Sequence, residues 1–375
     1  MLDTKKSEKN FINNLSIESF RNHQYLEIIT KTPSIVIYGK NGVGKTSILE
    51  AISIFSNTKG LRNSKLLEMI KVDQEMFCIS MNIQDGNDIY SELKSTYSKY
   101  NKTRKIYING KEKKKIGELR HSFPMLWITP YDEKIFKGGP SSRRAFLDRI
   151  VSNFDFSHPG RINNYNKLLQ QRSKVLKENN KDKDWLDAIE DQLSKLAVAI
   201  CSSRLDILNR ISSFLTEKIS GLPTVKIDFF ESIENSLLEN PAIKIEEDLR
   251  VKYRESRKLD LIVGGSLHGS HKTELICHNL EKKMPAEMCS SGEQKLLLIS
   301  IILSCAKALK KSIKVSPIML LDEIFTHLDG FKKNLLFNEL MSLGSQIWIT
   351  TAETDNFLKK YDNVYYYELK DNPEN

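Results

Sequence analysis

The stretch Gly39-Lys-Asn-Gly-Val-Gly-Lys-Thr46 fits the phosphate-binding pattern G-x-x-x-x-G-K-[ST]. It lies between a β-branched run, Ser34-Ile-Val-Ile-Tyr38, and an amphipathic segment that begins at Thr46, which is the strand-to-helix context that the pattern requires. The glycines let successive backbone N–H groups turn toward phosphates, and the following helix adds its positive end. The stretch therefore predicts a nucleoside triphosphate site in an α/β domain; the alternative is a glycine-rich turn that binds nothing.

Two side chains of this loop carry the expected chemistry. Lys45 is expected to reach the β- and γ-phosphates and to act in catalysis, and Thr46 is expected to hold Mg²⁺. The residues expected to contact ATP are Gly39, Lys40, Asn41, Gly42, Val43, Gly44, Lys45, Thr46 and Ser47.

A second apolar run, Pro317-Ile-Met-Leu-Leu-Asp-Glu323, ends in two carboxylates. In phosphoryl-transfer sites the first acid of such a strand binds Mg²⁺ and the second can activate water, so we expect these roles for Asp322 and Glu323. Two acids after a strand can also begin an ordinary helix. Thr350 and Thr351 end the next expected core strand, and either hydroxyl is a candidate sensor of the γ-phosphate.

Ser290 and Glu293 have the S-x-x-E spacing of a capping box and precede the apolar segment Lys295–Leu309. Such a box marks a helix N-terminus with free N–H groups. Alone, it indicates a capped buried helix. Beside a phosphate loop and an acidic strand, it indicates another part of a nucleotide site.

The bulk composition limits the class of protein. With 375 residues, 40% of them hydrophobic, the chain is long enough for two or three units with cores and is not generally disordered. The net charge of +9 suits a polyanionic partner such as nucleic acid, although solubility alone explains a milder excess. The five cysteines form no C-x-x-C pair, which argues against a disulfide framework or a zinc site.

No segment has the pattern of a membrane anchor or a leader. The longest apolar run, residues 296–309, is interrupted by serine, cysteine and Lys307 and indicates a buried helix. The first ten residues carry charge without an apolar core, so we expect a cytoplasmic location and not secretion.

The N-terminal part alternates between extended runs and turns. Strands are expected at residues 15–17, 26–29 and 35–37, and again between 77 and 108. Asn109-Gly110 is a strong two-residue hairpin turn. The basic run beyond it, 111–115, makes Lys113 and Lys114 candidates for DNA contact, although most such runs are solvated hairpin ends.

The middle of the chain has helical spacing. Helices are expected over Arg161–Lys177 and from Trp185 to Leu215, with an exposed turn at residues 179–184 between them, and strands are expected to return after Pro223. We therefore predict a helical insert within a nucleotide-binding α/β domain. The expected divisions are 1–120, 121–265 and 266–375, the last with the capping-box motif, the acidic strand and the threonine strand.

The order of phosphate loop, Ser-x-Gly-Glu, Leu-Leu-Asp-Glu and Leu-Asp resembles that of the ABC and SMC-type ATPases, in which the serine loop completes the site of a second subunit. The resemblance implies a head-to-tail homodimer formed on ATP. In that dimer Ser290, Ser291 and Gly292 would contact the partner's ATP, and Asp329 would lie in the loop at the dimer interface.

Further segments narrow the resemblance to the RecF family of bacterial DNA repair ATPases. They are Ser19-Phe-Arg-Asn22, Leu49-Glu-Ala-Ile52, Thr129-Pro-Tyr-Asp132 and Lys137-Gly-Gly-Pro-Ser-Ser-Arg-Arg-Ala-Phe-Leu-Asp148. The resemblance covers most of the chain. It implies an ABC/SMC-type P-loop ATPase head, lobe I, with a largely helical lobe II inserted and no long coiled coil.

The resemblance also implies a function. The protein would be a weak, DNA-stimulated ATPase that uses ATP and Mg²⁺ as a switch, binds double-stranded DNA and prefers gapped or single-strand/double-strand junctions. It would work with RecO- and RecR-type partners to load the RecA-type recombinase, with no membrane partner. Arg62, Arg143 and Arg144 are plausible phosphate or DNA contacts, although surface arginines commonly contact only water.

One segment departs from the family. Where a Gly-Pro-His-Arg-Asp-Asp-like run is usual, this chain has Gly269-Ser-His-Lys-Thr-Glu274, and Lys272 cannot reproduce the planar, bidentate grip of an arginine. We also place no glutamine in the Mg²⁺-contacting loop of related ATPases.

Two rival functions share the nucleotide motifs. One is an ATPase subunit of another system, either transport or SMC-like chromosome maintenance; the long helical insert and the RecF-like middle segment oppose it. The other is an ATP-gated nuclease, for which the chain after Asp329 is expected to leave no room for an acidic catalytic domain.

Overall fold

The structure is a computed structural model that describes residues 8–9, 11–56, 58–84, 90–113, 123–178, 183–352 and 358–370. The chain divides into two compact units. Unit 1 comprises Met1–Glu133, Lys218–Leu222 and Leu298–Asn375, and unit 2 comprises Lys134–Glu217 and Pro223–Leu297. Each unit therefore combines segments that are distant in the sequence.

A five-stranded parallel sheet carries the predicted phosphate loop in unit 1. Its order is β16-β4-β15-β14-β9, and every neighbouring pair is parallel. The strands are β4 Ser34–Tyr38, β9 Met125–Ile128, β14 Ile318–Asp322, β15 Ile347–Thr351 and β16 Val364–Glu368. The central strands are almost continuously apolar because both faces of a parallel sheet are covered. Their carboxyl ends meet at one edge, which is where ligands bind in open α/β sheets.

A six-stranded antiparallel sheet forms the second layer of unit 1, with the order β3-β2-β5-β6-β7-β8. Its strands are β2 Phe11–Phe20, β3 His23–Ile29, β5 Met76–Gln84, β6 Tyr90–Ser98, β7 Arg104–Ile108 and β8 Lys111–Lys113. Burial alternates along β5, as expected for a sheet with one face on a core. The hairpin predicted at Asn109-Gly110 is confirmed: both residues have positive φ, 49° and 74°, which a type I′ turn needs.

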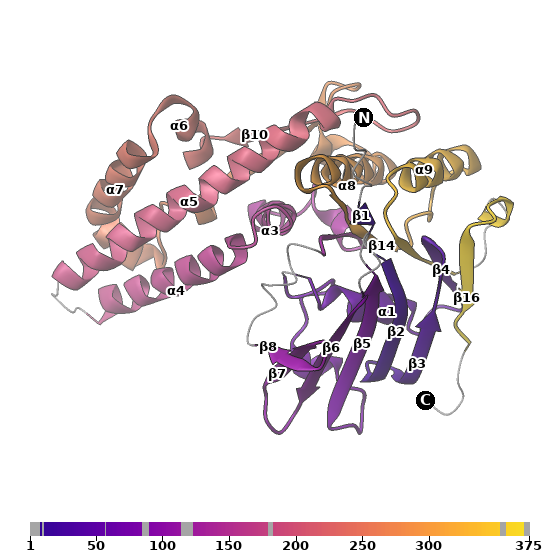
Figure 1. Ribbon diagram of the computed structural model, residues 1–375. Coiled ribbons are helices and arrows are strands. Elements are labelled where there is room, and N and C mark those ends of the chain that lie inside the picture. The colour runs from indigo at the N-terminus through magenta and orange to yellow at the C-terminus, as the bar shows by residue number, and fades with distance from the viewer. Residues whose placement is uncertain are drawn as a thin grey trace, which may run out of the picture. The chain divides into compact units, whose positions relative to one another are not determined.

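Helix α1, Lys45–Ser53, packs into the core of unit 1. Its apolar residues join one cluster with side chains of both sheets, including Ile17 of β2, Phe77 of β5 and Trp348 of β15. Figure 1 shows α8, Ser291–Ile313, beside α9, Gly330–Ser342. A short parallel pair, β1 Glu8–Lys9 with β13 Val315–Ser316, completes the strands described in this unit.

Three long helices dominate unit 2. Figure 1 shows α4, His158–Lys177, α5, Lys183–Leu215, and α7, Ala242–Val263, running side by side. Apolar side chains from all three meet in one cluster, among them Tyr165, Leu193 and Tyr253. The remaining elements are α3 Pro140–Val151, α6 Ile233–Glu239 and a small antiparallel sheet of β10 Val225–Phe230, β11 Glu274–Asn279 and β12 Met284–Pro285.

The structure corrects the expectation for the segment after Pro223. A strand does return at β10, but α6 and the 22-residue α7 follow it before β11. Helix α7 buries Ile245, Leu249 and Tyr253 at four-residue spacing, a pattern that we did not pick out from the sequence. The expected turn at residues 179–184 lies partly outside the described residues, and α5 already begins at Lys183.

Residues 266–297, which the sequence grouped with the C-terminal part, fall in unit 2. The reason is the pairing of β11 with β10 along six residue pairs, from Val225–Asn279 to Phe230–Glu274. In the described parts of the chain, no helix is both long and apolar enough to cross a bilayer.

Candidate functional site

The phosphate loop of unit 1 is held in a conformation that needs glycine. Gly42 and Gly44 have φ of 91° and 103°, and Lys45 begins α1 directly after them. A Cβ on Gly44 would meet the Asn22 side chain at 2.4 Å and Nε2 of His23 at 2.7 Å. The turn between β2 and β3 therefore packs directly against the loop, and His23 Nε2 lies 3.1 Å from the Gly44 carbonyl oxygen.

Lys45 lies at the start of α1, almost fully buried beneath the loop. Its ammonium group donates to the carbonyl oxygens of Gly39 and Lys40 at 2.7 and 2.9 Å. Burial lowers the pKa of Lys45, and the nearby Glu323 and Asp322 partly offset that effect. A buried ammonium that only neutral carbonyl oxygens solvate is strongly stabilised when an anion such as phosphate binds to it.

Asp322 is the centre of a hydroxyl–carboxylate cluster at the carboxyl edge of the parallel sheet. Thr46 donates its hydroxyl to both carboxylate oxygens, at 2.9 and 3.0 Å, and Thr350 donates at 2.6 Å. Asp322 and Thr350 are paired residues of β14 and β15, so the sheet register brings them together. The predicted metal pair, Thr46 and Asp322, is thus adjacent in space although 276 residues separate it in sequence.

Glu323 turns away from the strand that precedes it. Its φ is 51°, which is uncommon for a residue other than glycine, and its backbone N–H donates to the Thr350 hydroxyl at 3.0 Å. The carboxylate lines the same cavity as Lys45 and Thr46. The Thr350 hydroxyl therefore donates a hydrogen bond to Asp322 and accepts one from the backbone of Glu323. Thr351 is the half-buried last residue of β15.

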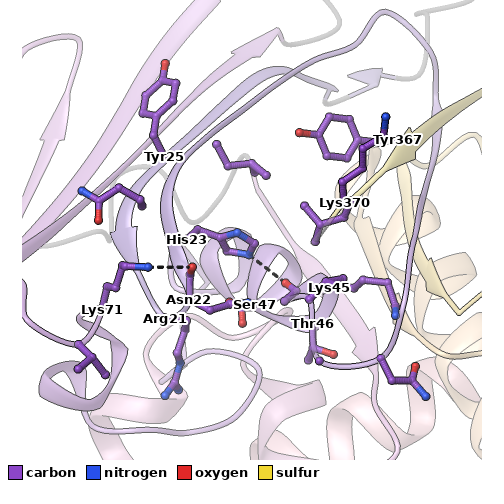
Figure 2. A pocket seen from close by; sticks show the side chains of 18 of the residues that line it. Arg21, Asn22, His23, Tyr25, Lys45, Thr46, Ser47, Lys71, Tyr367 and Lys370 are labelled. Atoms are coloured by element: carbon purple, nitrogen blue, oxygen red, sulfur yellow. Dashed lines mark hydrogen bonds between the residues drawn. The ribbon is translucent and has the colours of Figure 1, made fainter. Parts of the chain in front are cut away.

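A cavity of about 1200 Å³ opens above the loop. Figure 2 shows Lys45 and Thr46 along one part of its wall, Tyr25 and Lys71 on one side and Tyr367 with Lys370 on another. It exceeds the usual range of small-ligand pockets, about 300–1,000 Å³, so a nucleoside triphosphate fits with room to spare.

Sequence reasoning missed an ion-pair network beside this cavity. Arg21, with a φ of 55°, donates to both carboxylate oxygens of Glu50, Nε at 2.8 Å and Nη2 at 2.6 Å. Glu50 is fully buried in α1, and Arg62 approaches it at 3.4 Å. The only available signal was the pair of segments Ser19–Asn22 and 49–52, which we used for resemblance and not for contact.

The capping box predicted at Ser290 is confirmed within unit 2. The Ser290 N–H donates to Glu293 Oε2 at 2.9 Å, and the Glu293 N–H donates to the Ser290 hydroxyl at 3.4 Å. Lys282 and Ser290 lower the pKa of Glu293 to about 2, which keeps the box ionised. Ser291 and Gly292 begin α8 and are exposed.

Arg143 and Arg144, predicted as DNA candidates, are engaged within unit 2. Arg143 Nη2 pairs with Glu274 at 2.6 Å, and its Nη1 donates to the Gly138 carbonyl at 2.7 Å. Arg144 donates to the Thr273 carbonyl at 2.9 Å. Both guanidinium groups therefore hold the departing segment 269–274.

The departing segment itself is tightly packed. Gly269 has a φ of 124°, and a Cβ there would meet the Tyr165 hydroxyl at 1.9 Å and the Tyr253 hydroxyl at 2.6 Å. His271 Nδ1 lies 2.9 Å from the Tyr165 hydroxyl, whereas Lys272 is exposed. Lys272, where the resemblance predicts an arginine, therefore faces solvent in this unit.

Two other predicted residues, Asp329 and Lys113, are not among the residues that line the cavity. Asp329 is the N-cap of α9, where its carboxylate accepts from the Lys332 N–H at 2.9 Å. Lys113 ends β8, and Lys114 lies outside the described residues. Among the residues that the structure describes, no group of three or more His, Cys, Asp or Glu side chains is arranged to hold a metal by itself.

Comparison with known proteins identifies the relatives of this chain. Residues 11–373 match the family model described as RecF/RecN/SMC N terminal domain. The chain is 34% identical over 353 residues to proteins named DNA replication and repair protein RecF from Rickettsia conorii and Rickettsia prowazekii, covering 93% of this chain and 97% of each relative.

Solved structures agree with these matches. A structure titled as the recombination mediator protein RecF-ATPrS in the RecFOR pathway matches with a TM-score of 0.83 and 25% identity, covering 96% of both chains. A second, titled with RecF-ATP, matches the fold at 24% identity and a TM-score of 0.81. The predicted fold class is confirmed.

Proposed function

Because the chain belongs to the RecF family, we propose that it is an ATP-dependent DNA-binding protein of recombinational repair. The observation that carries this proposal is the cluster of Lys45, Thr46, Asp322 and Thr350 at the edge of the parallel sheet, beneath a cavity that Glu323 also lines. In this proposal the cavity takes ATP, with contacts from Gly39, Lys40, Asn41, Gly42, Val43, Gly44, Lys45, Thr46 and Ser47.

The donor set fits Mg²⁺ bound together with phosphates. A hydroxyl and a carboxylate 2.9 Å apart are hard oxygen ligands, and Mg²⁺ usually takes only one or two protein carboxylates besides phosphate and water. When bound, the ion neutralises charge on the β- and γ-phosphates. The Lys45 ammonium exchanges its hydrogen bonds to carbonyl oxygens for hydrogen bonds to the phosphates. Glu323 orients and deprotonates the attacking water.

Thr350 positions both acids in the proposed reaction. Its hydroxyl orients Asp322 and anchors the backbone of Glu323. A contact between the γ-phosphate and the neighbouring Thr351 would therefore change the positions of both acids through Thr350. Either threonine serves as the switch in this proposal. Turnover is slow in this proposal, because catalysis rests mainly on positioning and charge neutralisation.

ATP acts as a switch for dimerisation. Each site is completed by Ser290, Ser291 and Gly292 of a second copy, whose exposed helix N-terminus suits a phosphate, and Asp329 lies at the dimer interface. The dimer clamps double-stranded DNA at gaps or junctions. DNA stimulates the weak ATPase, and hydrolysis opens the clamp.

The partners follow from the pathway named for a solved relative. We propose that RecO- and RecR-type mediators join the clamp and load a RecA-type recombinase in the cytoplasm. Among the DNA candidates, Lys113 is on a hairpin. Arg62 lies at the cavity wall and also contacts Glu50, and Arg143 and Arg144 have partners within unit 2.

Light scattering with purified protein tests the proposal. We expect a monomer without nucleotide and a dimer with ATP, Mg²⁺ and duplex DNA, and DNA affinity that falls steeply with added salt. A protein that stays monomeric at saturating ATP, Mg²⁺ and duplex DNA would contradict the switch. A dimer that forms with ATP but ignores DNA would favour another ATPase system.

A further inference from the structure

A groove in unit 2 lies between α4 and the segment that follows α7, away from the groups used above. It has a volume of about 710 Å³ and is lined by residues at the end of α4 and by residues 263–266, 271 and 272. Its principal lining residues are Leu169, Lys174, Lys177, Glu178, Val263 and Lys272.

The end of α7 exposes three aliphatic side chains, of which Val263 lines the groove. Leu259, Ile262 and Val263 are 56%, 80% and 63% exposed, although the opposite face of α7 is fully buried. Unit 2 therefore completes its own core without these residues. Clustered aliphatic exposure of this kind marks an interaction surface more often than scattered single residues do.

The backbone after the helix is open as well. A Cβ placed on Gly264 or Gly265 would meet no atom within 4 Å. Gly264 ends α7 with a φ of 78°, and the N–H groups of Gly264 and Gly265 both donate back to the Asp260 carbonyl oxygen, so the end of the helix holds the turn. The backbone of another polypeptide can therefore approach Gly264 and Gly265 closely.

The rim of the groove is basic. Lys174 pairs with Glu178 at 3.6 Å across an exposed helix turn, a weak contact that solvent screens. For Lys177 and Lys272 the structure records no ion pair with any residue that it describes. Three lysines against one glutamate leave an excess of positive charge around an apolar floor.

We propose that this groove docks an acidic protein segment that inserts an aliphatic or aromatic side chain against Val263. Lysine stems can pack on such a segment while their ammonium groups pair with its carboxylates. Recognition of this type needs only a few residues with an anchor in a pocket. The inference goes beyond the proposed function and does not depend on nucleotide binding.

Two other occupants fit the surface less well. DNA in the groove would place phosphates against the apolar Val263 and beside the Glu178 carboxylate, so the phosphate charges would lose water there without gaining a cationic partner. A second copy in a two-fold contact would bring two copies of the same basic patch together, and their like charges would repel.

A selection from a displayed library of short random peptides, with the immobilised full-length chain as target, tests the proposal. We expect enriched peptides to carry net negative charge and at least one aliphatic or aromatic residue. A synthetic copy of the best peptide should lose about tenfold or more in affinity with Val263→Asp and with the double variant Lys177→Glu/Lys272→Glu.

Matched variants at the other end of α7 serve as controls. Ile243 is 62% exposed, and Lys244 is an exposed lysine, so Ile243→Asp and Lys244→Glu make the same chemical changes away from the groove. Both should bind the peptide as the wild type does. Thermal melts of all variants exclude unfolding as the cause of lost binding.

Several outcomes would overturn the proposal. They are no enrichment, enrichment of neutral or basic peptides, and equal peptide binding by Val263→Asp. Binding of a duplex oligonucleotide that the lysine double variant loses and Val263→Asp keeps would assign the groove to nucleic acid. Nucleotide-free self-association that Val263→Asp abolishes would assign it to a second copy.

Discussion

The cavity of unit 1 and the ionic core of unit 2 both bury positive charge, but they satisfy it differently. In unit 2, Arg172 is buried and bonded to Glu190 at 2.8 Å, Asp260 at 2.6 Å and the Tyr253 carbonyl at 2.7 Å. In unit 1, the buried Lys45 donates only to carbonyl oxygens of its own loop and lines an open cavity.

The difference separates structural charge from charge available to a ligand. A buried arginine whose donors are all taken by carboxylates and carbonyls has nothing left to offer an anion. A buried ammonium held by neutral oxygens can exchange them for phosphate. By this criterion Arg143 belongs with the structural group, because Glu274 and the Gly138 carbonyl occupy its guanidinium.

The largest expected effect is at the proposed catalytic base. Glu323→Gln should lower the rate of ATP hydrolysis by about 10²–10⁴-fold, the usual contribution of a general base, and leave ATP binding intact. Phosphate-release assays should show the lower rate, and light scattering should show a dimer that persists with ATP bound. Hydrolysis at the normal rate would mean that another residue activates water.

Removing Arg172 from the buried ion pairs of unit 2 tests whether this charge is structural. Arg172→Ala should lower the free energy of unfolding by about 3–5 kcal/mol, because it leaves the buried Asp260 without its arginine and Glu190 with Arg257 alone. Urea denaturation measures the change. Arg210→Ala removes only an exposed pair with Asp206 and should cost less than about 1 kcal/mol; equal losses in both variants would refute the distinction.

Removing the Lys45 ammonium, which donates to carbonyl oxygens and not to a carboxylate, should weaken ATP binding and leave the stability of the fold unchanged. Lys45→Ala should weaken ATP binding by about 3 kcal/mol, the scale of a charge-assisted hydrogen bond, and prevent ATP-dependent dimerisation. Calorimetric titration and a thermal melt measure the two quantities. A melting temperature that drops markedly would show that Lys45 is structural, as Arg172 is.

Arg143 offers a sharper test because sequence and structure suggest different roles. Arg143→Ala should lower the free energy of unfolding by about 1–2 kcal/mol through loss of the Glu274 pair. The salt dependence of DNA binding should stay unchanged. A salt slope reduced by about one unit would instead identify Arg143 as a phosphate contact.

The smallest effect concerns a partly buried carboxylate of unit 2, that of Asp155. Burial raises the pKa of Asp155, but hydrogen bonds from Ser157, Arg161 and Ser203 outweigh it and lower the pKa to about 2. The stabilisation is therefore present above the unfolded pKa of about 3.9 and is lost as the pH falls toward 2. After allowance for solvent screening, it amounts to about 1 kcal/mol or less.

Asp155→Asn measures that contribution directly. The variant should be slightly less stable than the wild type at neutral pH, and the two stabilities should converge between about pH 4 and pH 2. A difference that stays constant through this range would show that the effect is packing and not ionisation.

Much of the site could be predicted from local patterns. The phosphate loop, the capping box at Ser290 and the Asn109-Gly110 turn are confirmed because each depends on the conformation of a few adjacent residues. The long helices over 161–177 and 185–215 were also predicted, since their apolar spacing repeats over many turns. Helix α7 was missed, because its buried face alternates with many charged residues.

By itself, the sequence determined which segments carry the chemistry: a loop shaped by glycine φ angles, an acidic strand end and a capped helix. Only the tertiary structure decided which charges remain available. The pairing of Asp322 with Thr46, of Arg21 with Glu50 and of Arg143 with Glu274 spans 276, 29 and 131 residues. Such contacts are set by sheet register and packing, which no local pattern specifies.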